Sequence, residues 1–198
     1  MGREGTCIAA PMEIERILAA LKGREPKALI GNHFKPAAVL VPIQQKKDGY
    51  HLVLTVRAEG LNSHGGQVAF PGGRLDPQDT GPLEAALRES QEEVGLDPRD
   101  VRILGQLDQV TAAASYLVTP FVGVIPFPYD FTLNPDETAE VFSVPISALR
   151  DSNCLSIDTK RHGGWSPVYH FQYQQWDIWG ATAKMIKQLL ELAYDYKA

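Results

Sequence analysis

Residues 72–96 read GGRLDPQDTGPLEAALRESQEEVGL. After a polar loop punctuated by glycine and proline, the stretch 83–94 has the apolar spacing of an amphipathic helix. Gly95 follows it, and glycine most readily adopts the left-handed conformation in which many helices end. We therefore predict a helix over residues 83–94, the clearest helix in the chain.

Acidic side chains gather on one face of this predicted helix. Glu89, Glu92 and Glu93 stand at i, i+3 and i+4, so a period of 3.6 residues puts them on the same side, where their charges repel. A hard divalent cation would turn that repulsion into binding. Arg88 can reach Glu92 at i+4, and Gly72-Gly73 can bring a bare backbone carbonyl close to the same ion. The alternative is an acidic helix face exposed to solvent, because most clusters of like charge on a helix are exposed surface.

These residues resemble the box of the Nudix hydrolases: a glycine, a spacer with an acid, then Arg-Glu-apolar-x-Glu-Glu-x-Gly-apolar. There are two departures from this box. The spacer is one position longer, so its acid must be Asp79, and Ser90 replaces an apolar residue. The matching positions are Gly73, Arg88, Glu89, Glu92, Glu93, Gly95 and Leu96.

This resemblance implies an α/β fold, the Nudix α/β/α sandwich with a mixed sheet between helices, here as a single domain over 1–198. It also implies a metal-dependent hydrolase of a pyrophosphate linked to another group, with Mg²⁺ or Mn²⁺ as cofactor. The implied metal ligands are Gly73, Glu89, Glu92 and Glu93, with Arg88 orienting the glutamates.

A further ligand or a general base in this family often lies beyond the box. Glu137 and Glu140 are the candidates here, although each could equally be an exposed carboxylate of a loop or strand edge. We expect Glu140 to be the catalytic one, because it begins a predicted strand and a strand positions a side chain more firmly than a loop does.

The segment before the box resembles the coenzyme A pyrophosphatase subfamily. That signature runs Leu-Leu-Thr-x-Arg-Ser/Ala, then Arg, Gly and Phe-Pro-Gly-Gly at fixed spacing; Val53, Asn62, Gly66 and Phe70 stand at its Leu, Arg, Gly and Phe places. Segments 134–145 and 178–183 also resemble this subfamily. Asn62 removes a fixed cation, and a neutral amide does not replace an arginine–phosphate contact. The resemblance implies four substrate-binding residues: Arg57, His64, Phe70 and Arg74.

The implied reaction cleaves coenzyme A or acyl-coenzyme A at the diphosphate and releases 3',5'-ADP and a 4'-phosphopantetheine product. The partner is thus a small nucleoside diphosphate. Two alternatives stay open: another substrate such as ADP-ribose or a dinucleotide, or a non-catalytic Nudix-fold module that binds a nucleotide. The complete set of Arg88, Glu89, Glu92 and Glu93 favours the enzyme. His64 has its own alternative, a hydrogen bond within its glycine-rich loop.

Flanking segments read as a mixed α/β chain. Residues 37–43 and 51–57 are expected to form a hairpin around Asp48-Gly49. Trp179 is expected in the core, as large aromatic residues usually are. The other expected elements are helices at about 12–22, 147–149 and 182–194, and strands at 101–110, 116–125 and 139–144.

Composition narrows the function further. The chain has 198 residues and a formal net charge of -5, which argues against nonspecific nucleic-acid binding. No run approaches the roughly 20 apolar residues of a membrane-spanning helix. No apolar secretory segment follows Met1, and Cys7 and Cys154 are expected to be unpaired thiols, so we expect a cytoplasmic protein. The oligomeric state is open, a homodimer included.

Overall fold

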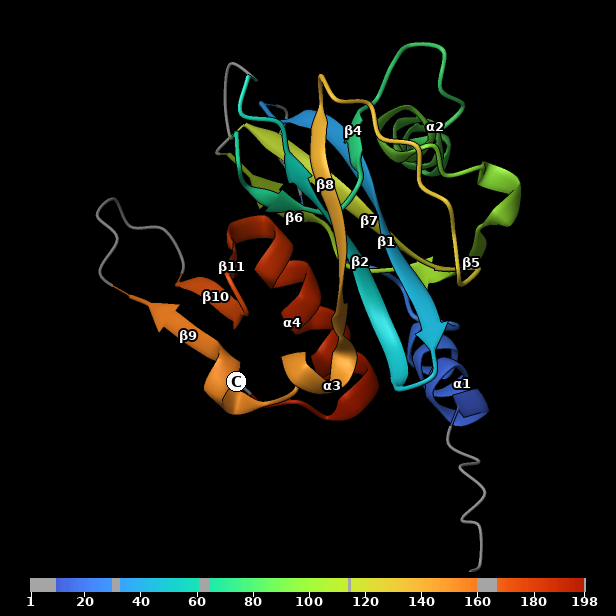
Figure 1. Cartoon of the computed structure of the whole chain (residues 1–198). Coiled ribbons are helices and arrows are strands. Elements are labelled where there is room, and N and C mark those ends of the chain that lie inside the picture. Colours follow the sequence, from blue (N-terminus) through green and yellow to red (C-terminus); the bar gives the residue numbers. More distant parts are fainter. Residues whose placement is uncertain (1–9, 30–32, 61–64, 114, 160–166, 198) are drawn as a thin grey trace, which may run out of the picture.

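A mixed β-sheet forms the centre of the computed structural model, with helices on both of its faces (Figure 1). The structure describes residues 10–29, 33–60, 65–113, 115–159 and 167–197. Five of the eight strands run in the order β3-β2-β1-β7-β5, with β4 beside β1, β6 beside β7 and β8 beside β2. The strands are β1 (Lys35–Lys46), β2 (Gly49–Arg57), β3 (Val68–Ala69), β4 (Gly72–Arg74), β5 (Arg102–Gln106), β6 (Val110–Ala112), β7 (Tyr116–Ile125) and β8 (Thr138–Pro145).

Strands β1 and β2 form the antiparallel hairpin that the sequence predicts, with Lys46 opposite Gly49 at its tight end. β1 pairs in parallel with β7 on its other side, and β2 pairs antiparallel with β8. The combination of parallel and antiparallel pairs makes the sheet mixed, as expected.

The two faces of the sheet are covered by different helices. Helix α2 (Pro82–Val94) lies on one face, and helices α1 (Ala10–Leu21) and α4 (Gly180–Tyr194) lie on the other (Figure 1). Successive side chains of a strand point to opposite faces, so Leu40 packs with Val94 while Val41 belongs to the core beneath α4. Burial on both faces explains why β1 and β2 read as nearly continuous apolar runs.

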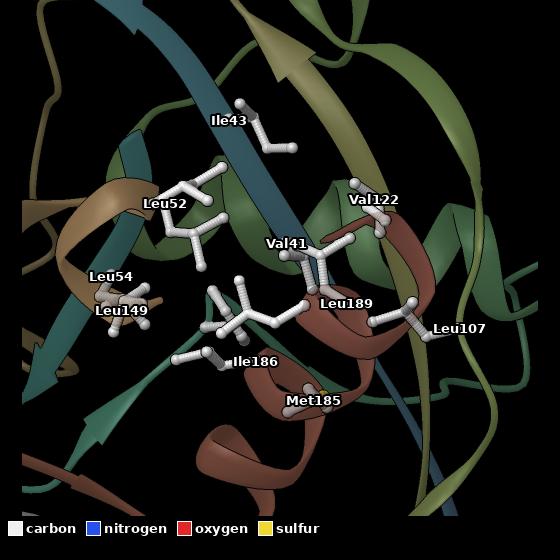
Figure 2. Close-up of a cluster of buried hydrophobic side chains, with 14 of the residues drawn as sticks. Val41, Ile43, Leu52, Leu54, Leu107, Val122, Leu149, Met185, Ile186 and Leu189 are labelled. Carbon is white, nitrogen blue, oxygen red and sulfur yellow. The ribbon is translucent and has the colours of Figure 1, made fainter. Parts of the chain in front are cut away.

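The larger core lies between the sheet and α4. Figure 2 shows Val41, Leu52 and Leu54 of the hairpin close to Ile186 and Leu189 of α4. All five side chains are fully buried. This packing holds the hairpin in place, and the hairpin in turn supports the strands on which the polar site is built.

The expected α/β/α architecture is confirmed, and several element boundaries differ from expectation. The predicted strand 101–110 is two strands, β5 and β6, because Asp108 leaves the ladder to accept hydrogen bonds from the backbone N–H of Lys27 and from Arg24. The helix expected at 147–149 is a single turn, α3 (Ile146–Leu149).

A second, three-stranded sheet was not foreseen from the sequence. It consists of β9 (Leu155–Asp158), β10 (Val168–Tyr173) and β11 (Trp176–Trp179), in the order β11-β10-β9. Trp179, expected in the core, is half-buried and stacks on His170 across β10 and β11. Cys154 carries a free thiol, and Cys7 lies outside the described residues. No helix of the described chain is long and apolar enough to cross a membrane.

Candidate metal and active site

Helix α2 presses two of the three box glutamates against strand β4. It ends where predicted: Gly95 adopts a φ of 69°, and its N–H donates to the carbonyl oxygens of Ser90 and Gln91. Two residues earlier, Glu93 Oε2 accepts a hydrogen bond of 3.2 Å from the backbone N–H of Gly72. The helix therefore holds the Glu93 carboxylate against the backbone of β4.

Two glycines make this close approach possible. A Cβ atom on Gly73 would overlap the Glu89 carboxylate, whereas a Cβ on Gly72 would overlap the backbone of β1 at Ala38 and Val39. Gly72 also has a φ of 146°, which a residue with a side chain adopts only with strain. Gly73 thus leaves space for a carboxylate, and Gly72 for a strand.

A third carboxylate completes the group. Glu89, Glu93 and Glu137 each offer an oxygen atom, and these atoms lie within 4.8 Å of one another. Glu137 lies in the segment just before β8. In this segment the N–H of Asn134 donates to the carbonyl oxygen of Glu93, and the carbonyl oxygen of Glu137 accepts from the N–H of Ala58. The loop before β8 is therefore tied both to α2 and to the end of β2, which fixes Glu137 beside the box glutamates.

Burial makes the ionised form of these carboxylates unfavourable unless a positive charge lies beside them. Burial raises the pKa of Glu93 to about 7, against the opposing effects of the Gly72 N–H and of Arg57, whose Nη1 lies 3.9 Å from Glu93 Oε1. Burial likewise raises the pKa of Glu89, and a hydrogen bond from Arg88 opposes the rise. Three carboxylates pressed together in a half-desolvated site suit a hard divalent cation with oxygen ligands. The donor set thus fits Mg²⁺ or Mn²⁺.

Arg88 holds the glutamate side of the site in place. Its Nη1 donates to both Glu89 and Glu92 at 3.0 Å, so the contact with Glu92 expected at i+4 is confirmed. Its Nε and Nη2 donate hydrogen bonds of 3.0 and 3.1 Å to the carboxylate of Asp79, and these bonds lower the pKa of Asp79. The acid in the spacer therefore positions the arginine that positions the glutamates.

The structure separates the expected site residues into different surroundings. The side chain of Glu92 is 52% exposed; it faces Arg88 and is not part of the group formed by Glu89, Glu93 and Glu137. Glu140 is also exposed and stands opposite Val56 in the ladder, so it does not join that group. Sequence reasoning favoured Glu140 for its place in a strand. Glu137 is brought in instead because the loop before the strand is anchored to α2.

The expected substrate-binding residues also differ in their surroundings. Phe70 is only 2% exposed and packs in the core beneath α4, so it is a supporting residue rather than one that a substrate can cover. Arg74 is exposed, and its guanidinium lies 5.2 Å from the centre of the Tyr116 ring. Arg57 is half-buried beside Glu93, a contact that the sequence did not indicate. His64 and Asn62 lie outside the described residues.

Comparisons with known proteins show to which family the chain is related. The family model described as NUDIX domain matches residues 33–161. A protein of Photorhabdus laumondii named "Uncharacterized Nudix hydrolase NudL" is 46% identical over 84% of this chain and 88% of its own length. One of the same name from Cronobacter sakazakii is 38% identical over 91% of this chain and 94% of its own.

Solved structures show the same fold. The Nudix hydrolase RenU of M. smegmatis superposes with a TM-score of 0.50 and 25% identity, over 62% of this chain and 76% of its own. DR0079 of Deinococcus radiodurans reaches a TM-score of 0.52 at 12% identity, over 81% and 83% of the two chains. With the family model covering all eight strands of the main sheet and all of α2, the chain belongs to the Nudix hydrolase family, enzymes that act on pyrophosphate bonds.

Proposed function

We propose that this chain hydrolyses the diphosphate linkage of coenzyme A or acyl-coenzyme A, with Mg²⁺ or Mn²⁺ as cofactor. The observation that carries the chemistry is the group of Glu89, Glu93 and Glu137 packed against Gly72-Gly73. The choice of substrate is supported by the segment from Val53 to Gly73, which resembles the coenzyme A pyrophosphatase signature.

Each residue of the site has a distinct part in this proposal. Glu89 and Glu93 would hold the cation, which when bound neutralises phosphate oxygens and acidifies a bound water. Glu137 takes the proton of the attacking water. The water oxygen then bonds to one phosphorus, the bridging P–O bond breaks, and the electron pair leaves with the other phosphate.

Arginines supply the fixed positive charge. Arg57 is half-buried next to Glu93, where its remaining N–H groups can donate to a diphosphate oxygen. Arg74 is exposed and available to a more distant part of the substrate. Phe70 contributes indirectly, since its buried ring anchors the chain just before Pro71, whose carbonyl oxygen accepts the N–H of Leu40.

A substrate panel tests the proposal. Purified protein with Mg²⁺ or Mn²⁺ would be assayed against coenzyme A, acetyl-coenzyme A, dephospho-coenzyme A, ADP-ribose and a diadenosine polyphosphate, with products identified by chromatography. We expect kcat/KM for the coenzyme A compounds to exceed that for ADP-ribose by about tenfold or more, a difference of roughly 1.4 kcal/mol. Faster cleavage of ADP-ribose or the dinucleotide would move the chain to another substrate. Binding without cleavage would make it a nucleotide-binding module.

The general base can be tested with a pair of neighbouring glutamates. We expect Glu137→Gln to lower kcat by about 100-fold or more, because positioned proton transfer contributes about that much, and to change the acidic limb of the pH profile. Glu140→Gln, three residues further along in β8, serves as the matched control, and its kcat should stay within about twofold of wild type. A larger loss in Glu140→Gln than in Glu137→Gln would return the base to the residue that the sequence favoured.

A further inference from the structure

A cavity of about 190 Å³ lies between the sheet and the segment that follows β7. Its floor comes from three neighbouring strands: Lys46 at the end of β1, Val53 in the middle of β2 and Ser143 near the end of β8. Phe127 and Phe131 of the segment after β7 close it from the other side. Established small-molecule sites usually measure about 300 to 1,000 Å³, so this cavity suits one end of a larger ligand rather than a whole one.

The cavity opens on the same face of the sheet as the carboxylates. Val53, Val141 and Phe131 pack in the cluster that includes Val94 and Leu96, at the end of α2. A second cavity of about 360 Å³ is lined by Ile14, Leu18 and Tyr50, all of which belong to the core on the opposite face. Of these two, only the first can be reached along the face that carries Glu89, Glu93 and Glu137.

Strands β2 and β8 join the carboxylates to the cavity. Glu137 precedes β8, Thr138 pairs with Arg57, and Ser143 pairs with Val53 further along the ladder. At about 3.3 Å per residue, the stretch of β8 from Thr138 to Ser143 is roughly 17 Å long. The residues of β8 between Thr138 and Ser143 are exposed or half-buried, so solvent reaches the path.

We propose that this cavity receives the sulfur end of the pantetheine arm, together with a short acyl group where one is attached. The inference rests on coenzyme A being the substrate, as proposed above. About thirteen bonds separate the phosphorus from the sulfur in 4'-phosphopantetheine, and a chain of this kind spans roughly 15 Å when extended. With its diphosphate at the carboxylates, the arm therefore ends at the cavity.

The chemistry of the walls fits that end of the arm. Phe127 and Phe131 offer apolar surface to an acyl chain above the buried Val53, and burying each methylene group contributes about 0.8 kcal/mol. A polar corner is formed by Lys46, whose Nζ donates to Ser143 Oγ at 2.5 Å and lies 5.0 Å from the centre of the Phe127 ring. The ammonium group of Lys46 has three N–H donors, so it can also donate to the carbonyl oxygen of a thioester or of the last amide.

Two variants of the cavity test this placement. Ser143→Leu fills the cavity from a half-buried position, and Phe127→Ala removes a wall that is 49% exposed. Ile157→Ala, 44% exposed on β9, is the matched control for losing an exposed apolar side chain elsewhere. KM and kcat would be measured for acetyl-coenzyme A and coenzyme A, and the inhibition constant for 3',5'-ADP, which lacks the arm.

We expect Ser143→Leu to raise KM for acetyl-coenzyme A by about tenfold and for coenzyme A by less, because the added isobutyl group occupies the space of the acyl group. Phe127→Ala should raise KM for acetyl-coenzyme A by about threefold and decides the question if Ser143→Leu does not fold. In both variants kcat and the inhibition constant of 3',5'-ADP should stay within about twofold of wild type, as in Ile157→Ala.

Equal loss of affinity for 3',5'-ADP and acetyl-coenzyme A would overturn the placement, and so would unchanged KM values in folded variants. Either result leaves the proposed function intact, because the wild type still cleaves coenzyme A. If the wild type cleaves ADP-ribose but neither coenzyme A compound, the proposed function itself is wrong, and the placement of the pantetheine arm in the cavity is refuted with it.

Discussion

Replacing Glu93 with glutamine should lower kcat by about 100-fold or more, because a neutral amide cannot replace a carboxylate that binds the cation, whose stabilisation of the transition state is worth several kcal/mol. Glu89→Gln should cause a loss of similar size, since the two carboxylates contribute to one group. Glu92→Gln is the matched comparison, because Glu92 faces Arg88 at the exposed edge, and we expect a smaller loss there. Steady-state kinetics over a series of Mg²⁺ and Mn²⁺ concentrations would check all three.

The same Glu93 variant carries its own folding control. In the metal-free protein the pKa of Glu93 stands at about 7 against an ordinary value of 4.5, because the carboxylate is buried. The folded state therefore binds the proton more tightly than the unfolded state, and stability falls as pH rises from about 4.5 to about 7. The full effect is roughly 3 kcal/mol at pH 8, an upper bound because solvent relaxes the site.

Glu93→Gln removes this penalty, so the metal-free variant should be more stable than wild type at pH 8 and nearly equal to it at pH 4.5. Urea denaturation with a chelator at the two pH values measures the difference. A variant that is less stable at pH 8, or that keeps near wild-type turnover while folded, would refute the assignment of Glu93 to the metal.

Gly73→Ala should abolish most activity while the protein stays folded. Its new Cβ would overlap the end of the Glu89 side chain, which can rotate away but then leaves the group with Glu93 and Glu137. We expect a loss of about 100-fold in kcat and weaker binding of Mn²⁺, measured by titration of the metal.

Gly72→Ala provides the contrast. Its Cβ would meet the backbone of β1, and its φ of 146° adds strain, so we expect this variant to lose stability by several kcal/mol in chemical denaturation. A folded, fully active Gly73→Ala would show that the metal site tolerates a side chain there and that Glu89 is not held by this contact.

Much of the architecture could be predicted because its signals are local. The spacing of apolar residues and Gly95 define α2 within one residue of its observed start, and the Asp48-Gly49 turn defines the hairpin of β1 and β2. The second sheet was missed because β9 to β11 are short, and their partly exposed residues give no clear alternation: Ile157 is exposed, whereas Trp176 and Trp179 are half-buried.

The sequence by itself determined the helix, the shared face of Glu89 and Glu93 and the glycines before it, because period and spacing along one segment decide them. Only the tertiary structure decided which carboxylate from elsewhere joins them. Glu137 and Glu140 are three residues apart and chemically identical, and the choice depends on the hydrogen bond from the Asn134 N–H to Glu93 O, a contact between distant segments. The burial of Phe70 and the contact of Arg57 with Glu93 were decided in the same way, since both depend on strand pairing and packing rather than on neighbours in the chain.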